Sequence, residues 1–311
     1  MKIDQTFNHH SKPTEDAEGE KKSSMHTERE VERMEEDDDF VPVIVKRTDA
    51  ALRHPDDILE KAIEEGVEQQ NRAFISLFLS AMAAGLILGF TAMSVAIVQS
   101  QMLLLDGVFF ARLATATVYP LGFVLCIMSG TQLFTEHTAT AVYPVLDRRG
   151  SLWKLSRLWF VVIIGNLVGA MIIAIVLVSA EDVINAEPGY IEIGKHLISY
   201  PTRPLFFSAL LAGWLMALGA WLILATSSTI SQIASIYIVT FIIGIGGLHH
   251  SIAGSVEMFT AYLISDIFSV AQVLRFVMLA IVGNLVGGSI FVATLNYGHI
   301  RKTQKTHKIK Q

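Results

Sequence analysis

Long apolar runs occupy most of the chain from residue 73 onward, and short polar segments separate them. A transmembrane helix needs about 20 predominantly apolar residues to cross a hydrocarbon core about 30 Å thick. On this measure the sequence predicts membrane spans at residues 73–98, 108–146, 158–179, 205–225, 233–265 and 273–297. The first run begins too late and is too long to be a signal peptide. We therefore expect an all-α membrane protein with six transmembrane helices.

The second and fifth spans are too long for single plain helices, and polar residues or glycines interrupt both. The interruptions run from Ser129 to His137 and from Gly244 to Ser251. Backbone groups released by a break at membrane depth cannot face lipid, so each break must be buried in protein or line a wet cavity. Two such breaks predict a central pathway for a small solute.

The pentapeptide GNLVG occurs twice, once in the third span and once in the sixth. Because an odd number of spans separates the copies, the sequence predicts two inverted three-helix repeats with broken second and fifth helices. Glycines four residues apart let membrane helices approach closely, and asparagine can hydrogen-bond between helices. We assign this packing role, outside the pore, to Gly165, Asn166, Gly169, Gly283, Asn284 and Gly287.

The chain before the first span has a different composition. Residues 1–71 hold 20 of the 29 acidic and 10 of the 24 basic side chains. Residues 1–54 lack apolar periodicity and are predicted to form a disordered acidic cytoplasmic tail. Over residues 55–71, apolar residues recur at helical spacing, which predicts a short amphipathic cytoplasmic helix. A transmembrane domain over 72–298 and a basic cytoplasmic tail over 299–311 complete the predicted organisation.

Lysine and arginine collect between the second and third spans and in the C-terminal tail. Cytoplasmic loops carry an excess of these residues, so we place both segments in the cytoplasm. An even number of spans then puts both termini on the same side. The loop near residues 181–204 is expected on the opposite face.

Candidate chemistry lies in the two breaks. His249 and His250 stand in the second break, and an ionisable side chain at this depth is costly enough to mark a functional site by default. The alternative is a neutral imidazole that only braces the loop. In the first break, the Thr135 hydroxyl can bond the facing histidine or a passing carboxylate, or merely its own loop.

Other reactive side chains offer little. Cys126 is the only cysteine, which excludes an intrachain disulfide and a thiolate metal cluster. Glu136 beside His137, and Glu257 seven residues after His250, lack the spacing of a nucleophile or a metal site. We expect no enzymatic activity, no metal, no cofactor and no nucleic-acid partner.

The chain resembles the formate/nitrite transporter family, as a divergent bacterial inner-membrane member. The matching pieces are LGFVLCIMSGTQLFTEHTATAV from Leu121 to Val142, GGLHHSIA from Gly246 to Ala253, and the two GNLVG segments. Together with the span spacing, the similarity covers about residues 56–300. The first two pieces are specific, because they fall at the two breaks in the order that the family requires.

The resemblance implies an aquaporin-like fold and a homopentamer in the bacterial inner (plasma) membrane, with a pore in every protomer. It implies that His250 is the central pore histidine and that Thr135 can hydrogen-bond it. The implied cytoplasmic constriction consists of Leu133, Phe134 and Phe123. The implied periplasmic constriction consists of Tyr119 and Ile243.

The chain departs from the family pattern beside these residues. His249 stands where an acidic residue is usual, and Trp214 and Gly254 stand where asparagine is common. Glu257 follows within the same span. These departures leave the scaffold intact and bear on the substrate.

We therefore expect transport of formate or a similar small monovalent anion. A bare carboxylate would lose most of its hydration at an apolar ring, at a cost of several kcal/mol. We expect a proton, arriving directly or through His250, to neutralise it first. The alternatives are a neutral-solute pore, reshaped by Trp214, and a non-conducting scaffold or sensor that acts through the acidic tail.

Overall fold

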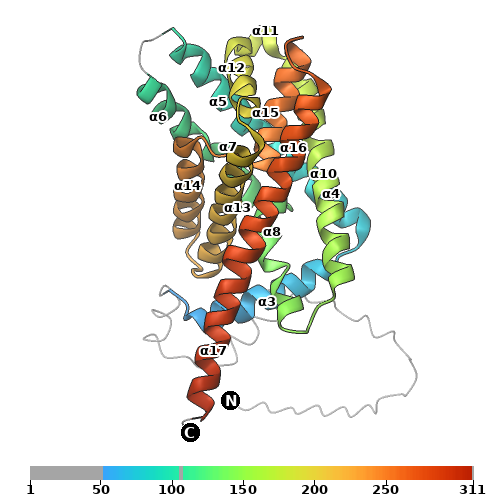
Figure 1. Ribbon diagram of the computed structural model, residues 1–311, viewed down its shortest axis with the longest axis vertical. Coiled ribbons are helices and arrows are strands. Elements are labelled where there is room, and N and C mark those ends of the chain that lie inside the picture. Colours follow the sequence, from blue (N-terminus) through green and yellow to red (C-terminus); the bar gives the residue numbers. More distant parts are fainter. Residues whose placement is uncertain (1–51, 105–107, 310–311) are drawn as a thin grey trace, which may run out of the picture. The chain divides into compact units, whose positions relative to one another are not determined.

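The computed structural model describes residues 52–104 and 108–309 (Figure 1). Every regular element within these residues is a helix, and six helical stretches are long and apolar enough to cross a membrane. The prediction of an all-α chain with six candidate spans is thus confirmed. The predicted acidic tail lies almost entirely outside the described residues.

The first described helix, α3 (Pro55–Asn71), precedes the spans. Pro55 takes the first helical position, where its missing N–H costs nothing, and His54 Nδ1 accepts a bond from the Asp56 backbone N–H. The apolar face of α3 is buried against apolar residues that follow the first break, such as Tyr143, and against residues near the C-terminus, such as Ile300. Its buried apolar side chains are Ile58, Leu59, Ala62 and Ile63.

Six helical stretches account for the spans. They are α4 (Phe74–Ile87) with α5 (Gly89–Met102), α6 (Val108–Val118) with α7 (Pro120–Met128), α10 (Leu152–Ser179), α13 (Thr202–Leu224), α14 (Thr229–Gly246), and α16 (Val270–Val286) continued by the π-helix η2 (Gly287–Thr294) and α17 (Leu295–Ile309). After α7 the chain breaks and resumes as α8 (Phe134–Thr140) and α9 (Tyr143–Leu146). After α14 it breaks and resumes as α15 (Ser251–Ile264).

The breaks contain fewer non-helical residues than the sequence suggested. Only 129–133 and 247–250 separate the helices, so Thr135 stands in the first turn of α8 rather than in a loop. Helices resume early because side chains from elsewhere bond their first backbone N–H groups, as described below. The polar character of 134–137 belongs to a short buried helix.

The third span begins at Leu152, six residues before the apolar run that predicted it. Its first turns contain Lys154 and Arg157, which lower the local hydropathy. Both are bonded to the end of α3: Lys154 Nζ donates to Asn71 Oδ1 at 2.7 Å and Arg157 donates to the Arg72 carbonyl at 3.1 Å. The span therefore starts in a polar contact rather than in lipid.

The segment expected as a loop near 181–204 contains two helices, α11 (Glu181–Ile184) and α12 (Glu187–Ile198). α12 packs against α5 and α15. Gly189 is required there, because a Cβ atom would overlap the Ala96 carbonyl oxygen of α5. Charged residues gave this segment the composition of a loop, whereas this close fit makes it part of the fold.

The C-terminal segment is also more regular than its composition suggested. The basic tail expected over 299–311 continues the last span as helix α17 through Ile309. Arg301 in this helix donates to Asp147 Oδ1 at 2.8 Å, and Tyr297 donates to the same oxygen at 3.0 Å. The start of the tail is thereby joined to the segment after the first break.

The two GNLVG segments make matching helix contacts, α10 against α4 and α16 against α13 (Figure 1). A Cβ atom at Gly169 would overlap the Met82 carbonyl oxygen of α4, and one at Gly287 would overlap the Leu210 carbonyl oxygen of α13. Gly165 and Gly283 face Ala81 and Ala209 in the same way. Each copy thus brings two helix backbones into direct contact.

Candidate functional site

The first break is closed at its leading end by its own hydroxyl groups. Gly130 turns the chain at φ 69°, in the left-handed region that favours glycine. The side chains of Ser129 and Thr131 both donate to the Cys126 carbonyl oxygen, at 2.7 and 2.8 Å. The end of α7 is therefore satisfied within the protein.

Asn166, in the first GNLVG segment, holds the far end of this break. Its Oδ1 accepts a bond from the Phe134 backbone N–H at 2.9 Å, where α8 begins. Its Nδ2 donates to the carbonyl oxygens of Gln132 at 2.8 Å and Ala81 at 2.7 Å. One fully buried side chain thus joins α4, α10 and the break.

Asn284, in the second GNLVG segment, makes the same three bonds at the second break. Its Oδ1 accepts from the Ser251 backbone N–H at 2.7 Å, where α15 begins. Its Nδ2 donates to the carbonyl oxygens of His249 at 3.1 Å and Ala209 at 2.6 Å. The asparagines expected to bond between helices also hold the broken backbones in place.

This correspondence pairs Leu133 with His250. Each is the last extended residue before its helix, at φ −93°, ψ 124° for Leu133 and φ −87°, ψ 130° for His250. The residues before them also match, because Ser80 and Ser208 accept the backbone N–H bonds of Gln132 and His249, both at 3.2 Å. The apolar and the imidazole side chain therefore occupy equivalent places in the two breaks.

His250 is bonded through both ring nitrogens and is 1% exposed. Nδ1 accepts from the backbone N–H groups of Ile252 at 3.2 Å and Ala253 at 3.1 Å, so it caps α15. Two donors pointing at Nδ1 leave the ring proton of a neutral imidazole on Nε2. Nε2 lies 2.7 Å from Thr135 Oγ1, to which it donates. The two breaks meet at this bond.

Apolar side chains surround the Thr135–His250 bond. Phe123 meets the His250 ring edge-on at 4.9 Å between ring centres, and Tyr119 lies 5.2 Å from Phe123. Leu133 and Phe134 directly precede Thr135 in the sequence and are as deeply buried. The five side chains expected at the constrictions are all buried: Tyr119, Phe123, Leu133, Phe134 and Ile243.

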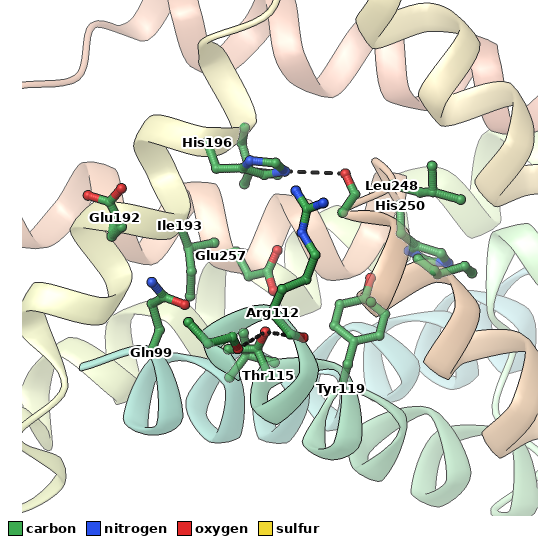
Figure 2. A pocket seen from close by; sticks show the side chains of 16 residues that line it. Gln99, Arg112, Thr115, Tyr119, Glu192, Ile193, His196, Leu248, His250 and Glu257 are labelled. Atoms are coloured by element: carbon green, nitrogen blue, oxygen red, sulfur yellow. Dashed lines mark hydrogen bonds between the residues drawn. The ribbon is translucent and has the colours of Figure 1, made fainter. Parts of the chain in front are cut away.

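A cavity of about 240 Å³, which we call the vestibule, opens beside His250 (Figure 2). Tyr119 and Ile243 line it, whereas Phe123, Leu133, Phe134 and Thr135 do not. Its polar lining also includes groups that the sequence did not single out as pore residues, contributed by α5, α6, α12 and α15. These are Gln99, Arg112, Thr115, Glu192, His196 and Glu257.

His249 is buried, does not line the vestibule and packs among other rings next to it. Its ring stacks on His196 at 5.5 Å and meets Tyr200 edge-on at 5.4 Å. Its Nδ1 lies 2.7 Å from Ser208 Oγ, while its Nε2 has no hydrogen-bond partner among the described residues. The structure therefore separates the two adjacent histidines by environment.

His196 connects this cluster to the vestibule. Its Nε2 donates to the Gly247 carbonyl oxygen at 3.2 Å, and its Nδ1 accepts from the Tyr200 hydroxyl at 3.3 Å. Burial lowers the pKa of His196, and the nearby Arg112 guanidinium lowers it further. Gly247 itself adopts φ 58°, which glycine permits and which brings its carbonyl to this ring.

The departures at Trp214 and Gly254 lie outside the vestibule. Trp214 is 38% exposed and stacks on Phe291 at 5.1 Å, so it does not shape the cavity. A Cβ atom at Gly254 would lie 2.6 Å from Phe276 Cζ, so no larger residue fits there without displacing that ring. The Phe276 ring in turn packs on His249 at 6.0 Å.

Two of the missed vestibule residues carried a signal in the sequence. Glu257 and Arg112 are ionisable residues inside apolar runs, which alone is reason to suspect function. His196 carried none, because it stands in a charged segment that resembles a loop. Within the part of the chain that the structure describes, no group of three or more potential metal ligands is present.

A sequence profile described as formate/nitrite transporter matches residues 56–298. The inner membrane protein YfdC of Escherichia coli is 30% identical over 248 residues, which cover 78% of each chain. A solved structure titled FNT family ion channel matches at a TM-score of 0.71 and 20% identity, over 78% of this chain and 98% of that one. Another, titled pentameric formate channel with formate bound, matches at a TM-score of 0.62 and 21% identity, over 72% and 96%.

The two structural matches show that the fold is that of these channels. The profile covers most of the chain, including α3, both breaks and both GNLVG segments. The chain therefore belongs to the formate/nitrite transporter family.

Proposed function

We propose that each protomer forms a pore that carries formate or a similar small monovalent anion across the bacterial inner membrane, linked to a proton. The observation that carries this proposal is the 2.7 Å bond between Thr135 and His250. It is a buried polar contact between two broken helices, set among apolar rings. Buried polar groups of this kind orient a small polar solute.

The bonding of His250 supports a role as a hydrogen-bond donor. With Nδ1 engaged by two backbone groups, Nε2–H is the donor that a passing solute can take over from Thr135. The freed Thr135 hydroxyl can donate as well. The pair thus offers two donors to an oxygen-rich solute where the two breaks meet.

The apolar surroundings favour passage as a neutral acid. Phe123, Leu133 and Phe134 offer an ion no hydrogen bonds from their side chains. Moving a bare carboxylate past them would cost several kcal/mol. We therefore place the proton-linked step before the solute reaches His250.

The assembly is part of the proposal. A homopentamer with both termini in the cytoplasm and two inverted three-helix repeats fits the matching asparagine frames and the solved neighbour titled a pentameric channel. Mass measurement in a mild detergent tests the pentamer. Labelling of cysteines introduced near Arg53 and His299 from each side of sealed vesicles tests the orientation.

Flux into proteoliposomes tests the substrate class. The protein should move at least one of formate, nitrite, acetate, lactate and hydrosulfide faster than empty vesicles, and faster at pH 6 than at pH 8. If all five anions entered no faster than into empty vesicles, the proposed function would be wrong.

Two variants separate the pore role of His250 from the structural alternative. His250→Ala and His250→Phe should reduce or alter flux while the assembly survives extraction. Collapse of the assembly in both would instead identify the ring as a structural brace.

A pore for neutral solutes is the second candidate, and the apolar constriction favours it because such a ring also passes uncharged molecules. Trp214 no longer supports it, since that ring lies outside the vestibule. Swelling assays with glycerol and urea should show no uptake above empty vesicles if the anion proposal is correct.

A further inference from the structure

Two carboxyl groups line the vestibule, and their surroundings differ. The Glu192 side chain is 45% exposed and pairs with Lys195 at 3.5 Å. Glu257 is 5% exposed, and among the described residues its carboxyl takes part in no hydrogen bond or ion pair. It lies among Gln99, Arg112 and Tyr119 in Figure 2.

Among the described residues, no cationic side chain forms an ion pair with the Glu257 carboxyl group, although Arg112 lines the same cavity. Tyr119 and Tyr190 are close enough to interact with it electrostatically and are themselves acids. α4, α8, α10 and α16, which also pack on α15, contribute no lining residue among those described. The remaining titratable or charged groups of the vestibule are Arg112, Glu192, His196 and His250.

A buried carboxylate without a partner is costly, so such a group stays neutral by holding a proton. α15 is an apolar helix too short to cross a membrane alone, and an ionisable residue in such a segment is a functional candidate by default. A protonated carboxyl can donate a hydrogen bond and then release the proton, and it does so far more readily than a tyrosine hydroxyl such as that of Tyr119.

His250 itself is poorly placed to supply a proton. To release one from Nε2 and remain neutral, the ring must first gain one at Nδ1. That nitrogen accepts the backbone N–H bonds of Ile252 and Ala253, so protonation would break both and expose two N–H groups at the start of α15. The proton for the solute therefore comes either from bulk water or from another group of the protein.

We infer that Glu257 is the proton-exchanging residue of the pathway, which gives its proton to the anion in the vestibule before the anion reaches His250. The inference rests on the proposed function. His250 immediately precedes α15 and Glu257 stands seven positions further along, so the two residues are roughly two helical turns, or about 10 Å, apart along the helix. That spacing leaves room for a small acid to be formed first and bound next.

The step balances within this site. The O–H bond of Glu257 breaks, an O–H bond forms on the anion, and the neutral acid moves on toward His250. The remaining carboxylate takes a proton from water that enters past the exposed Arg112. No other reactant is needed.

The test is formate flux into proteoliposomes at pH 5, 6, 7 and 8 with full-length protein. Without Glu257 as donor, only acid already formed in bulk water can pass, and its concentration falls about tenfold for each pH unit. Glu257→Gln should therefore match the wild type within about threefold at pH 5 and fall progressively behind it at each higher pH. Glu257→Asp, which keeps an acid, should restore much of the shallower wild-type profile.

Glu192→Gln is the matched control. It removes a carboxyl group that lines the same cavity but is exposed and paired with Lys195. Its pH profile should be that of the wild type. The inference is overturned if Glu257→Gln keeps the wild-type profile, if it loses flux equally at every pH, or if Glu192→Gln steepens the profile as much. A wild type without flux for any anion overturns the proposed function and this inference together.

Infrared difference spectra keep the test open if Glu257→Gln does not assemble. Addition of formate to the wild-type protein should deplete the C=O band of a protonated carboxyl group, and Glu257→Asp should shift that band. An unchanged carboxyl region in both proteins would overturn the inference.

Discussion

The two breaks share one frame and differ in what they present to the pathway. An asparagine with three bonds holds each of them, through Asn166 in one and Asn284 in the other. At equivalent positions stand Leu133, which leaves α8 without a side-chain cap, and His250, which caps α15. The asparagines that hold the breaks are therefore different residues from Leu133 and His250, which face the proposed pathway. The side chain at that position can vary while the asparagine frame stays the same.

Removing the asparagine frame should have the largest effect. Asn166→Ala and Asn284→Ala each remove three hydrogen bonds and leave two buried backbone groups of a break without a partner, at about 1–3 kcal/mol per group. We expect each to lower the free energy of unfolding by more than about 3 kcal/mol, measured by thermal or denaturant unfolding in detergent. Similar losses at both sites would support the equivalence of the breaks, and a loss at only one would contradict it.

Adding a methyl group at the close helix contacts of the GNLVG segments should lower the free energy of unfolding by somewhat less. Gly169→Ala and Gly287→Ala place a methyl group against a backbone carbonyl oxygen, and we expect losses of about 1–3 kcal/mol each in the same unfolding measurement. Gly298→Ala is the control, because nothing lies within 4 Å of its added methyl group. It should stabilise α17 by about 0.5–1 kcal/mol. A loss at Gly298 as large as that at Gly169 would show that replacing glycine lowers stability without any close contact, and would contradict the packing explanation.

Changing the two central side chains should affect transport more than stability. Thr135→Val keeps the shape but loses the hydroxyl, and His250→Asn keeps an acceptor for the start of α15 but loses the Nε2 donor. We expect each to reduce formate flux by about tenfold or more, which corresponds to about 1.4 kcal/mol, and to lower the free energy of unfolding by less than the asparagine variants do. Unaltered flux in both would remove the Thr135–His250 bond from the pathway.

The smallest expected effect is a pH dependence of stability that arises at His196, whose ring bonds the second break at Gly247. Burial lowers the pKa of His196 in the folded protein, so the unfolded chain takes up this proton first as the pH falls. The stability contributed by neutral His196 is therefore complete above about pH 6.5 and is lost as the pH falls below it. Comparing unfolding at pH 7.5 and pH 5.0 should show a smaller drop for His196→Gln than for the wild type. An equal drop would assign the dependence to other groups.

Much of the architecture could be predicted because it depends on the local composition of the chain. Six apolar runs indicated six spans, and glycine and polar residues inside two of them indicated the breaks. The family membership confirms the expectation of a transporter rather than an enzyme. Thr135 and His250, which the structure joins by a hydrogen bond, stood out as candidates because polar residues at membrane depth are conspicuous against an apolar background.

The vestibule could not be predicted in the same way. α12 has the charged composition of a loop, and only the fit of Gly189 against α5 makes it a wall of the site. Arg112 was absorbed into an apolar run by averaging. His249 and His250 are neighbours in the sequence, and only the folded backbone places one against the His196 ring and the other beside the vestibule.

The asparagine frame has a consequence for how the chain enters the membrane during synthesis. The backbone groups of Gln132 and Phe134 gain their partner only when α10 arrives with Asn166. Until then the first break cannot face lipid, so the second span should wait beside the insertion machinery for the third. Ribosome-stalled chains from which only the residues up to Gly150 have left the ribosome should crosslink to the translocation channel, whereas chains from which Ser179 has also emerged should be released as a three-helix unit. Equal release of both lengths would refute this order.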